Sequence, residues 1–144
     1  MKRNKECALV FDYGESRIGV AFANRVTQTT TVLKTILARN DLQAQHEIGA
    51  LVSEWQPDAI VIGVPYNVEG GATRMSALAM DFAQRLSDRF ELPIDAIDER
   101  LTSAEASMLL REKRRTGERR RRVNKEDIDR LAAQLIAETW LQSS

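Results

Sequence analysis

Apolar and polar positions along this chain alternate in blocks that predict five strands and four helices. Two runs, Cys7–Phe11 and Ala59–Val64, are apolar at every position. Such runs are typical of strands in the middle of a sheet that is covered on both faces. The first run ends in Asp12-Tyr13-Gly14, and Ile18–Ala23 then has the composition of a returning strand. The first two dozen residues therefore predict a β-hairpin with Asp12 at its tip.

The middle of the chain predicts a third strand and two helices. Thr27–Ile36 is rich in β-branched residues and predicts a third strand. A helix of about fifteen residues is expected from Asp41, ending before Pro57. Its apolar face would hold Leu42, Ile48, Leu51, Val52 and Trp55. A second helix is expected from Thr73, with an apolar face of Met75, Leu78, Ala79, Phe82 and Leu86.

The last third of the chain predicts one short strand and two helices. Pro93–Ile97 is the strand. Thr102 with Glu105 has the spacing of a capping box, which predicts a helix running towards Leu110. Asn124 with Asp127 gives a second cap, for a final helix that ends near Leu141. The expected fold is therefore α/β, with a mixed five-stranded sheet: a three-strand meander, then two strands reached by helical crossovers, flanked by helices.

Length and composition indicate an ordinary globular protein. The 144 residues are 43% hydrophobic and 29% charged, which suits one domain spanning 1–144. No stretch is long and apolar enough for a membrane span or a signal peptide. Cys7 is the only cysteine, so no intrachain disulfide can form. These features together predict a cytoplasmic protein in a reducing compartment.

The formal net charge of zero conceals a strong asymmetry. Residues 111–125 contain nine of the 21 basic residues and only two acidic ones, a local excess of seven positive charges. Like charges without apolar periodicity predict a mobile loop, at 111–124. A basic segment on an otherwise acidic protein favours nucleic acid as the partner. Taken alone, the same segment is equally typical of a solubilising loop.

Three acidic residues from distant segments are predicted to meet at one edge of the sheet. Asp12 ends the first strand and Glu99 follows the fifth, and ligands of α/β sheets bind beyond the carboxyl ends of parallel strands. On the final helix, an apolar stripe is expected at Ile128, Leu131, Ala132, Leu135 and Ile136. Asp129 lies on the flank of that stripe, in the sector that also holds Ala133, Ile136 and Trp140.

Three carboxylates suit Mg²⁺ or Mn²⁺, which prefer oxygen ligands. A zinc site is not expected, because the single histidine, His46, lies in a polar helix and Cys7 lies in the core. Two such metal ions would activate a water molecule and stabilise the leaving oxygen in phosphodiester hydrolysis. Asp12, Glu99 and Asp129 are therefore both the candidate metal ligands and the candidate catalytic residues.

Each of these residues also has a simpler explanation. Asp12-Tyr13-Gly14 by itself is more often a plain turn. Asp98 competes with Glu99, because only one of two successive strand residues faces a given side. Asp129 would alternatively form a structural salt bridge, for instance with Arg100. Gly70-Gly71 would either turn the chain or cradle a phosphate at a helix N-terminus, and we favour the turn.

Four segments resemble, in order, the sequence blocks of the YqgF family. They are Phe11–Ala21 (FDYGESRIGVA), Ile62–Gly70 (IGVPYNVEG), Asp98–Ser103 (DERLTS) and Asp129–Ile136 (DRLAAQLI). Members of that family are assigned to pre-16S ribosomal RNA cleavage and were earlier assigned to Holliday junction resolution. The blocks span nearly the whole chain, and together they are specific although each alone is weak.

The resemblance implies an RNase H-like fold and a divalent-metal nuclease that matures the 5′ end of small-subunit ribosomal RNA. Its acidic positions match Asp12, Glu99 and Asp129. Two departures are Tyr13, where phenylalanine is common, and the arginine-rich segment before the last helix. The expected phosphate and substrate contacts are Arg17, Asn67, Arg100, Arg119, Arg120, Arg121 and Arg122. A four-way DNA junction endonuclease and a non-catalytic nucleic-acid-binding factor are the alternatives.

Overall fold

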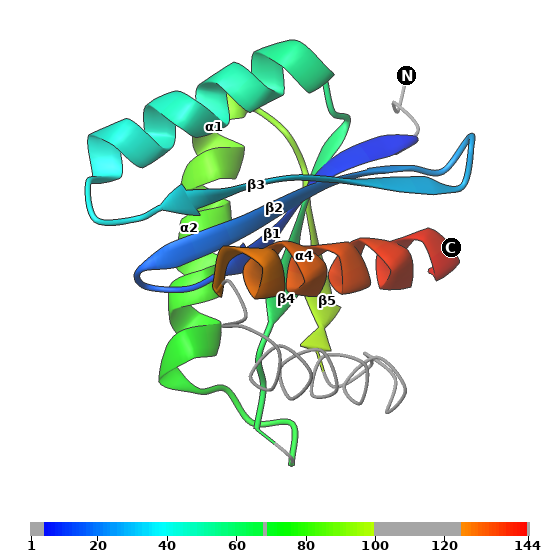
Figure 1. Cartoon of the computed structure of the whole chain (residues 1–144). Helices are drawn as coiled ribbons and strands as arrows, with labels where there is room; N and C mark the ends of the chain where they lie inside the picture. The colour runs from blue at the N-terminus through cyan, green and yellow to red at the C-terminus, as the bar shows by residue number, and fades with distance from the viewer. Residues whose placement is uncertain (1–4, 68, 100–124, 144) are drawn as a thin grey trace, which may run out of the picture.

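The computed structural model of the chain contains one five-stranded sheet (Figure 1). It describes residues 5–67, 69–99 and 125–143, and within 125–130 the helical backbone only. The strands lie in the order β3-β2-β1-β4-β5. Their bounds are β1 Cys7–Tyr13, β2 Arg17–Asn24, β3 Thr29–Leu37, β4 Ala59–Val64 and β5 Ile94–Asp98. The predicted strands are all present, with ends shifted by one or two residues.

The sheet is mixed, as the sequence predicted. Strand β2 pairs antiparallel with both β1 and β3, which forms the meander. Strand β4 is parallel to β1 and to β5. Helix α1 (Asp41–Trp55) precedes β4, and helix α2 (Arg74–Phe90) connects β4 to β5. The carboxyl ends of β1, β4 and β5 therefore lie at the same edge of the sheet.

Helices cover both faces of the sheet and divide the core in two. Helices α1 and α2 lie on one face, and helix α4 (Lys125–Gln142) crosses the other (Figure 1). Alternation along β1 sends Leu9 and Phe11 into the α1/α2 core and sends Ala8 and Val10 into the α4 core. This double burial explains why the β1 sequence is apolar at every position.

Side-chain caps fix where the first two helices begin. The side chain of Asn40 accepts a hydrogen bond from the backbone N–H of Gln43 at the start of α1. Thr73 and Ser76 form a reciprocal capping box at the start of α2. Leu42, predicted on the apolar face of α1, is instead 83% exposed. It lies six residues before the buried Ile48, which at about 100° per residue turns it well away from that face.

The buried face of α4 is centred differently from the expected stripe. Ala133, Ile136, Ala137 and Trp140 are fully or almost fully buried against the sheet. Leu131 and Ala132, both expected in the stripe, are only partly buried. Several small residues let the helix approach the sheet closely, and the fully buried tryptophan sets its rotation. Trp140, like the partly buried Trp55 on the other face of the sheet, is thus a packing residue.

Some predicted elements lie outside the described residues. They are the helix from Thr102 towards Leu110, the basic segment 111–124 and the cap at Asn124. Among the residues that are described, no helix combines the length and the apolar character that crossing a bilayer requires.

Gly63 on β4 leaves room for the side chains of Ile136 on α4 and of Glu99, just after β5, on the same face of the sheet. A Cβ atom at position 63 would collide with Cδ1 of Ile136 and would lie 2.9 Å from Oε1 of Glu99. Gly49 on α1 is different, because a Cβ there would meet Arg89 Nη2 at 3.6 Å, an ordinary contact. Close packing therefore favours glycine at position 63, whereas position 49 has room for a side chain.

We predict that Gly63→Ala lowers the free energy of unfolding by about 1–3 kcal/mol, because the added methyl group overpacks the space beneath Ile136. Gly49→Ala, the matched control, should instead raise it by roughly 0.5–1 kcal/mol, because alanine is the better helix former. Urea denaturation followed by circular dichroism measures both values. Equal stability of the two variants would contradict the close approach at Gly63.

Candidate functional site

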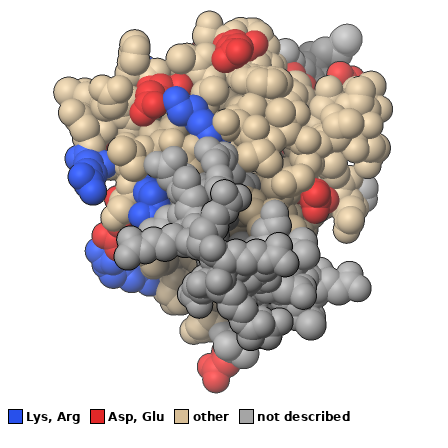
Figure 2. Space-filling view, viewed as in Figure 1, with Lys and Arg blue, Asp and Glu red and all other residues tan. Residues whose placement is uncertain are grey.

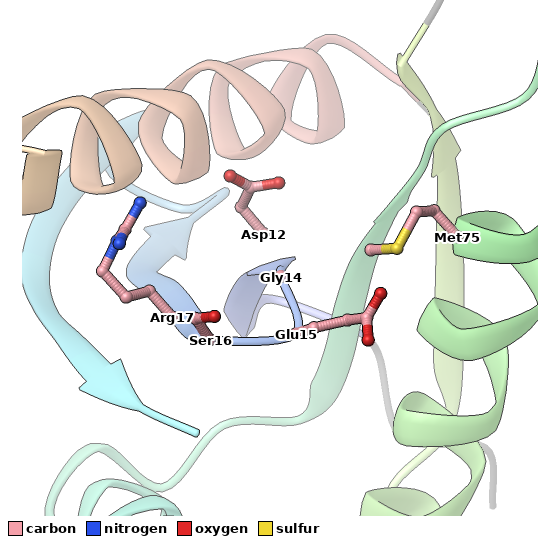
Figure 3. Close-up of a pocket in the computed structure, with 6 residues that line it drawn as sticks. All are labelled: Asp12, Gly14, Glu15, Ser16, Arg17 and Met75. Carbon is pink, nitrogen blue, oxygen red and sulfur yellow. The ribbon is translucent and has the colours of Figure 1, made fainter. Parts of the chain in front are cut away.

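Asp12 lies near the carboxyl end of β1 and faces α4. It shares this side of the strand with Ala8 and Val10, whereas Phe11 and Tyr13 pack on the α1/α2 side. Figure 3 shows the Asp12 carboxylate pointing towards α4. The residue sits inside the strand rather than at the hairpin tip, since β1 extends to Tyr13.

Glu99 reaches the same face of the sheet from the end of β5. Asp98 is paired with Val64, so Glu99 is the first residue beyond the strand. Its Oε1 atom lies over Gly63, on the side where Ile136 packs. Asp98 is the last residue of β5, where alternation turns it away from this face. The structure therefore brings Glu99, rather than Asp98, to Asp12.

The two carboxyl groups share a hydrogen bond, and this has an electrostatic consequence. Burial raises the pKa of Glu99, the hydrogen bond with Asp12 lowers it, and the charge of Asp98 raises it, with a net increase above the usual glutamate value. Two like charges at hydrogen-bonding distance need either a shared proton or a cation between them. This pair of oxygen donors is therefore chemically suited to a hard divalent cation.

The third predicted ligand is only partly described. Position 129 belongs to helix α4, but its side chain is outside the described part of the structure. Within the described ranges, no group of three or more His, Cys, Asp or Glu side chains is placed to hold a metal ion. The structure thus brings together two of the three predicted acids, Asp12 and Glu99.

A hollow of about 290 Å³ opens beside Asp12 at the turn between β1 and β2. Its lining residues are Asp12, Gly14, Glu15, Ser16, Arg17 and Met75 (Figure 3). A Cβ at position 14 would lie 2.6 Å from the carbonyl oxygen of Arg17, so this tight turn requires glycine. Arg17, a predicted phosphate contact, lies in the wall of the hollow. Its side chain points towards α4, as does that of Asp12.

Asn67, the other predicted substrate contact that the structure describes, does not line this hollow. Asn67 organises its own loop, because its Oδ1 accepts a hydrogen bond from the backbone N–H of Gly71 at 2.7 Å. The five other predicted arginines lie outside the described residues: Arg100, Arg119, Arg120, Arg121 and Arg122. His46 is exposed, as expected for a residue outside the site.

Sequence reasoning overlooked three residues near the hollow: Glu15, Arg74 and Met75. Arg74 forms an ion pair with Glu15 across the space between the hairpin and α2. The position of Arg74, directly after the helix cap Thr73, could have indicated a functional role. A cation at a helix N-terminus is disfavoured by the helix dipole, so stability alone does not explain its presence there. The space-filling view shows Lys and Arg groups, mixed with acidic ones, on the side of the molecule where this hairpin turn lies (Figure 2).

Two kinds of sequence comparison agree on the family. The family profile described as "RuvX: Holliday junction resolvase" matches residues 6–143. A relative from Dechloromonas aromatica is 44% identical over 94% of this chain and 90% of its own. Another, from Pseudomonas putida, is 40% identical over 94% of both chains. Both relatives carry the name "Putative pre-16S rRNA nuclease".

Comparison with solved structures supports the fold independently. Thermus thermophilus RuvC in complex with a Holliday junction substrate aligns with a TM-score of 0.54 over 90% of both chains, at 13% identity. A second T. thermophilus RuvC structure gives a TM-score of 0.52. At such low identity the likeness concerns the fold alone, and it confirms the predicted RNase H-like architecture. With the profile match across nearly its whole length, the chain belongs to the RuvX family, also called YqgF.

Proposed function

We propose that this protein is a divalent-metal-dependent nuclease that matures the 5′ end of pre-16S ribosomal RNA in the cytoplasm. The observation that carries the proposal is the Asp12–Glu99 pair, in which two carboxyl groups from distant strands share a hydrogen bond on one face of the sheet. Such a pair is costly for folding unless it binds something positive. We infer the substrate, pre-16S ribosomal RNA, from the names of the relatives.

The geometry of α4 supports Asp129 as the third ligand. Trp140 donates a hydrogen bond to Asp95 near the start of β5, and Ile136 packs over Gly63 near the end of β4. Going towards its N-terminus, α4 therefore runs towards the carboxyl edge of the sheet. Position 129 precedes Ile136 by seven residues, which is about two turns or ~10 Å along the same face of a helix.

Mg²⁺ or Mn²⁺, held by Asp12, Glu99 and Asp129, would supply an activated water molecule and charge neutralisation at the leaving oxygen. The chain's own residues then bind and orient the substrate. Arg17, in the wall of the hollow beside Asp12, is placed to contact a phosphate. The basic residues of segment 111–124 would grip the phosphate backbone, with Arg119 to Arg122 as their core.

A four-way DNA junction is the second candidate substrate, and the description of the family profile favours it. Both substrates present phosphodiester bonds, so the same acids would act on either one. A nucleic-acid-binding factor without catalysis is the third candidate, and the paired acids argue against it. Carboxylates that face phosphate would weaken pure binding by charge repulsion.

We expect the purified protein with Mn²⁺ to cleave a precursor 16S ribosomal RNA fragment and Asp12→Asn to reduce the rate by more than about 100-fold. Loss of even an outer-shell partner of a metal typically costs about 10–100-fold. Gel electrophoresis of labelled RNA measures the rate, and circular dichroism checks the folding of the variant. Asp98→Asn is the control and should lower cleavage less than tenfold. Full activity in Asp12→Asn would reject the assignment.

The same RNA and a four-way DNA junction of equal length should be compared side by side. The proposal expects faster cleavage of the RNA. Symmetric cleavage of the junction with no cleavage of RNA would instead establish the second candidate. Binding of RNA that is unaffected by chelator, with no cleavage of either substrate, would establish the third.

Glu99→Gln should raise the melting temperature of the metal-free protein at pH 7 and abolish its increase on adding Mn²⁺. Because burial raises the pKa of Glu99, ionising this residue costs stability as pH rises through its unfolded value towards its folded one. The amide removes that cost, but it also removes a ligand and hence the stabilisation by bound metal. Thermal melts with Mn²⁺ or chelator test this. A metal-induced shift that persists in Glu99→Gln would contradict the proposed site.

A further inference from the structure

The hollow beside Asp12 has two walls that come from different parts of the fold. One wall is the turn between β1 and β2, and the other is the first turn of α2, which contributes Met75. Figure 3 shows Glu15 extending towards α2, while Asp12 and Arg17 point towards α4. The hollow therefore leads away from the two paired acids, along a path that ends at α2.

Glu15, which lines the hollow, pairs with Arg74, which directly precedes the lining residue Met75, and this contact joins the two walls. Nη2 of Arg74 donates to Oε2 of Glu15 at 3.2 Å, and Nη1 donates to Oε1, so the contact is bidentate. The hydrogen bond and the charge of Arg74 lower the pKa of Glu15 below its usual value, although both side chains are exposed. The carboxylate is therefore ionised at neutral pH and accepts both hydrogen bonds from the guanidinium group.

Neither wall needs this ion pair for its own stability. The hairpin is held by the β1–β2 ladder and by its glycine turn, and α2 is capped by Thr73 and Ser76. The side chains of Arg74 and Glu15 are 72% and 50% exposed, and exposed ion pairs add little to folding. Arg74 also stands at the positive end of the helix dipole, which disfavours it locally. An anion bound beside Arg74 would be stabilised by both the guanidinium group and the positive end of the helix dipole.

We propose that this hollow holds the sugar-phosphate unit that flanks the cleaved bond, and that Arg74 is its phosphate-binding residue. In the substrate-free protein, Glu15 occupies Arg74 in place of the phosphate. The same planar guanidinium group binds a carboxylate and a phosphate in bidentate fashion, so one can replace the other. The inference deepens the proposed function and rests on it, because it takes the bond cleaved at Asp12 as its reference point.

The size and lining of the hollow define what it recognises. Its volume of about 290 Å³ is that of a small pocket and suits one sugar-phosphate unit rather than a base pair. None of the described residues that line it is aromatic, so this part of the structure provides no side chain on which a base could stack. A contact to phosphate positions the substrate without reading its sequence. Arg74 is therefore a positioning residue whose effect is the same for every sequence.

Binding measured with chelator present isolates this subsite from cleavage. The probes are two unrelated fluorescein-labelled 20-nucleotide RNAs, and fluorescence anisotropy gives the dissociation constant. Arg74→Gln should weaken binding about three- to tenfold for both RNAs. It should also lower the slope of log Kd against log salt concentration by about one, because one phosphate contact is lost. Glu15→Gln should tighten binding about two- to fivefold. The double variant should bind like Arg74→Gln, because the effect of Glu15 acts through Arg74.

Arg85→Gln is the matched control, since Arg85 also lies on α2 and forms exposed ion pairs, with Asp41 and Asp81. It should change binding less than twofold. Equal weakening by Glu15→Gln and Arg74→Gln, with a parallel fall in melting temperature, would show that the pair is a structural bridge and overturn the proposal. An effect of Arg74→Gln no larger than that of Arg85→Gln would also overturn it.

Failure of this inference and failure of the nuclease proposal give different results. Arg74-dependent binding by a protein that cleaves nothing in Mn²⁺ would leave the subsite standing and reject the chemistry. Cleavage of RNA with unchanged KM in Arg74→Gln would leave the nuclease standing and reject the subsite.

Discussion

Two carboxyl groups held together on a half-buried face of a sheet are the constraint around which this structure is built. Asp12 and Glu99 come from strands that are separated by β4, and Gly63 on that strand leaves room for the Glu99 carboxyl group, whose Oε1 atom would lie 2.9 Å from a Cβ there. The raised pKa of Glu99 records the electrostatic cost of the arrangement. Under the proposed function, a hard cation bound by the two oxygen donors would remove that cost.

The surrounding fold serves to hold this pair in place. Both faces of β1 and β4 are buried, and the edge strand β5 is paired with β4 from Ile94 to Asp98, which holds Asp12 and Glu99 in place relative to each other. Helix α4 is fixed at its far end by Trp140, which is fully buried, donates a hydrogen bond to Asp95 and packs against Arg25. A helix anchored there and packed closely on the sheet carries position 129 towards the same edge. Rigid elements are suited to such a site, because metal ligands tolerate little displacement.

Charge is distributed in keeping with an anionic substrate. The acids lie on the α4 side of the sheet edge, whereas Glu15, which lines the hollow beside them, is bound to Arg74 of α2. A ligand that displaces Glu15 from Arg74 must outcompete a carboxylate for the guanidinium group, and phosphate has the charge and geometry to do so. The family assignment and the relatives' names are consistent with a nucleic-acid substrate.

The sequence by itself predicted the mixed sheet with the five strands and three of the helices that the structure describes, and it named the candidate acids. Apolar runs and helix caps are local signals, so they place strands such as Cys7–Phe11 and helix starts such as Thr73 without reference to the rest of the chain. Only the tertiary structure decided between Asp98 and Glu99, because that choice depends on which face β5 presents to α4. It also decided the rotation of α4, where close packing of Trp140 and small residues overrides the most apolar stripe. The Glu15–Arg74 contact joins residues 59 positions apart, and no local pattern encodes such a distance.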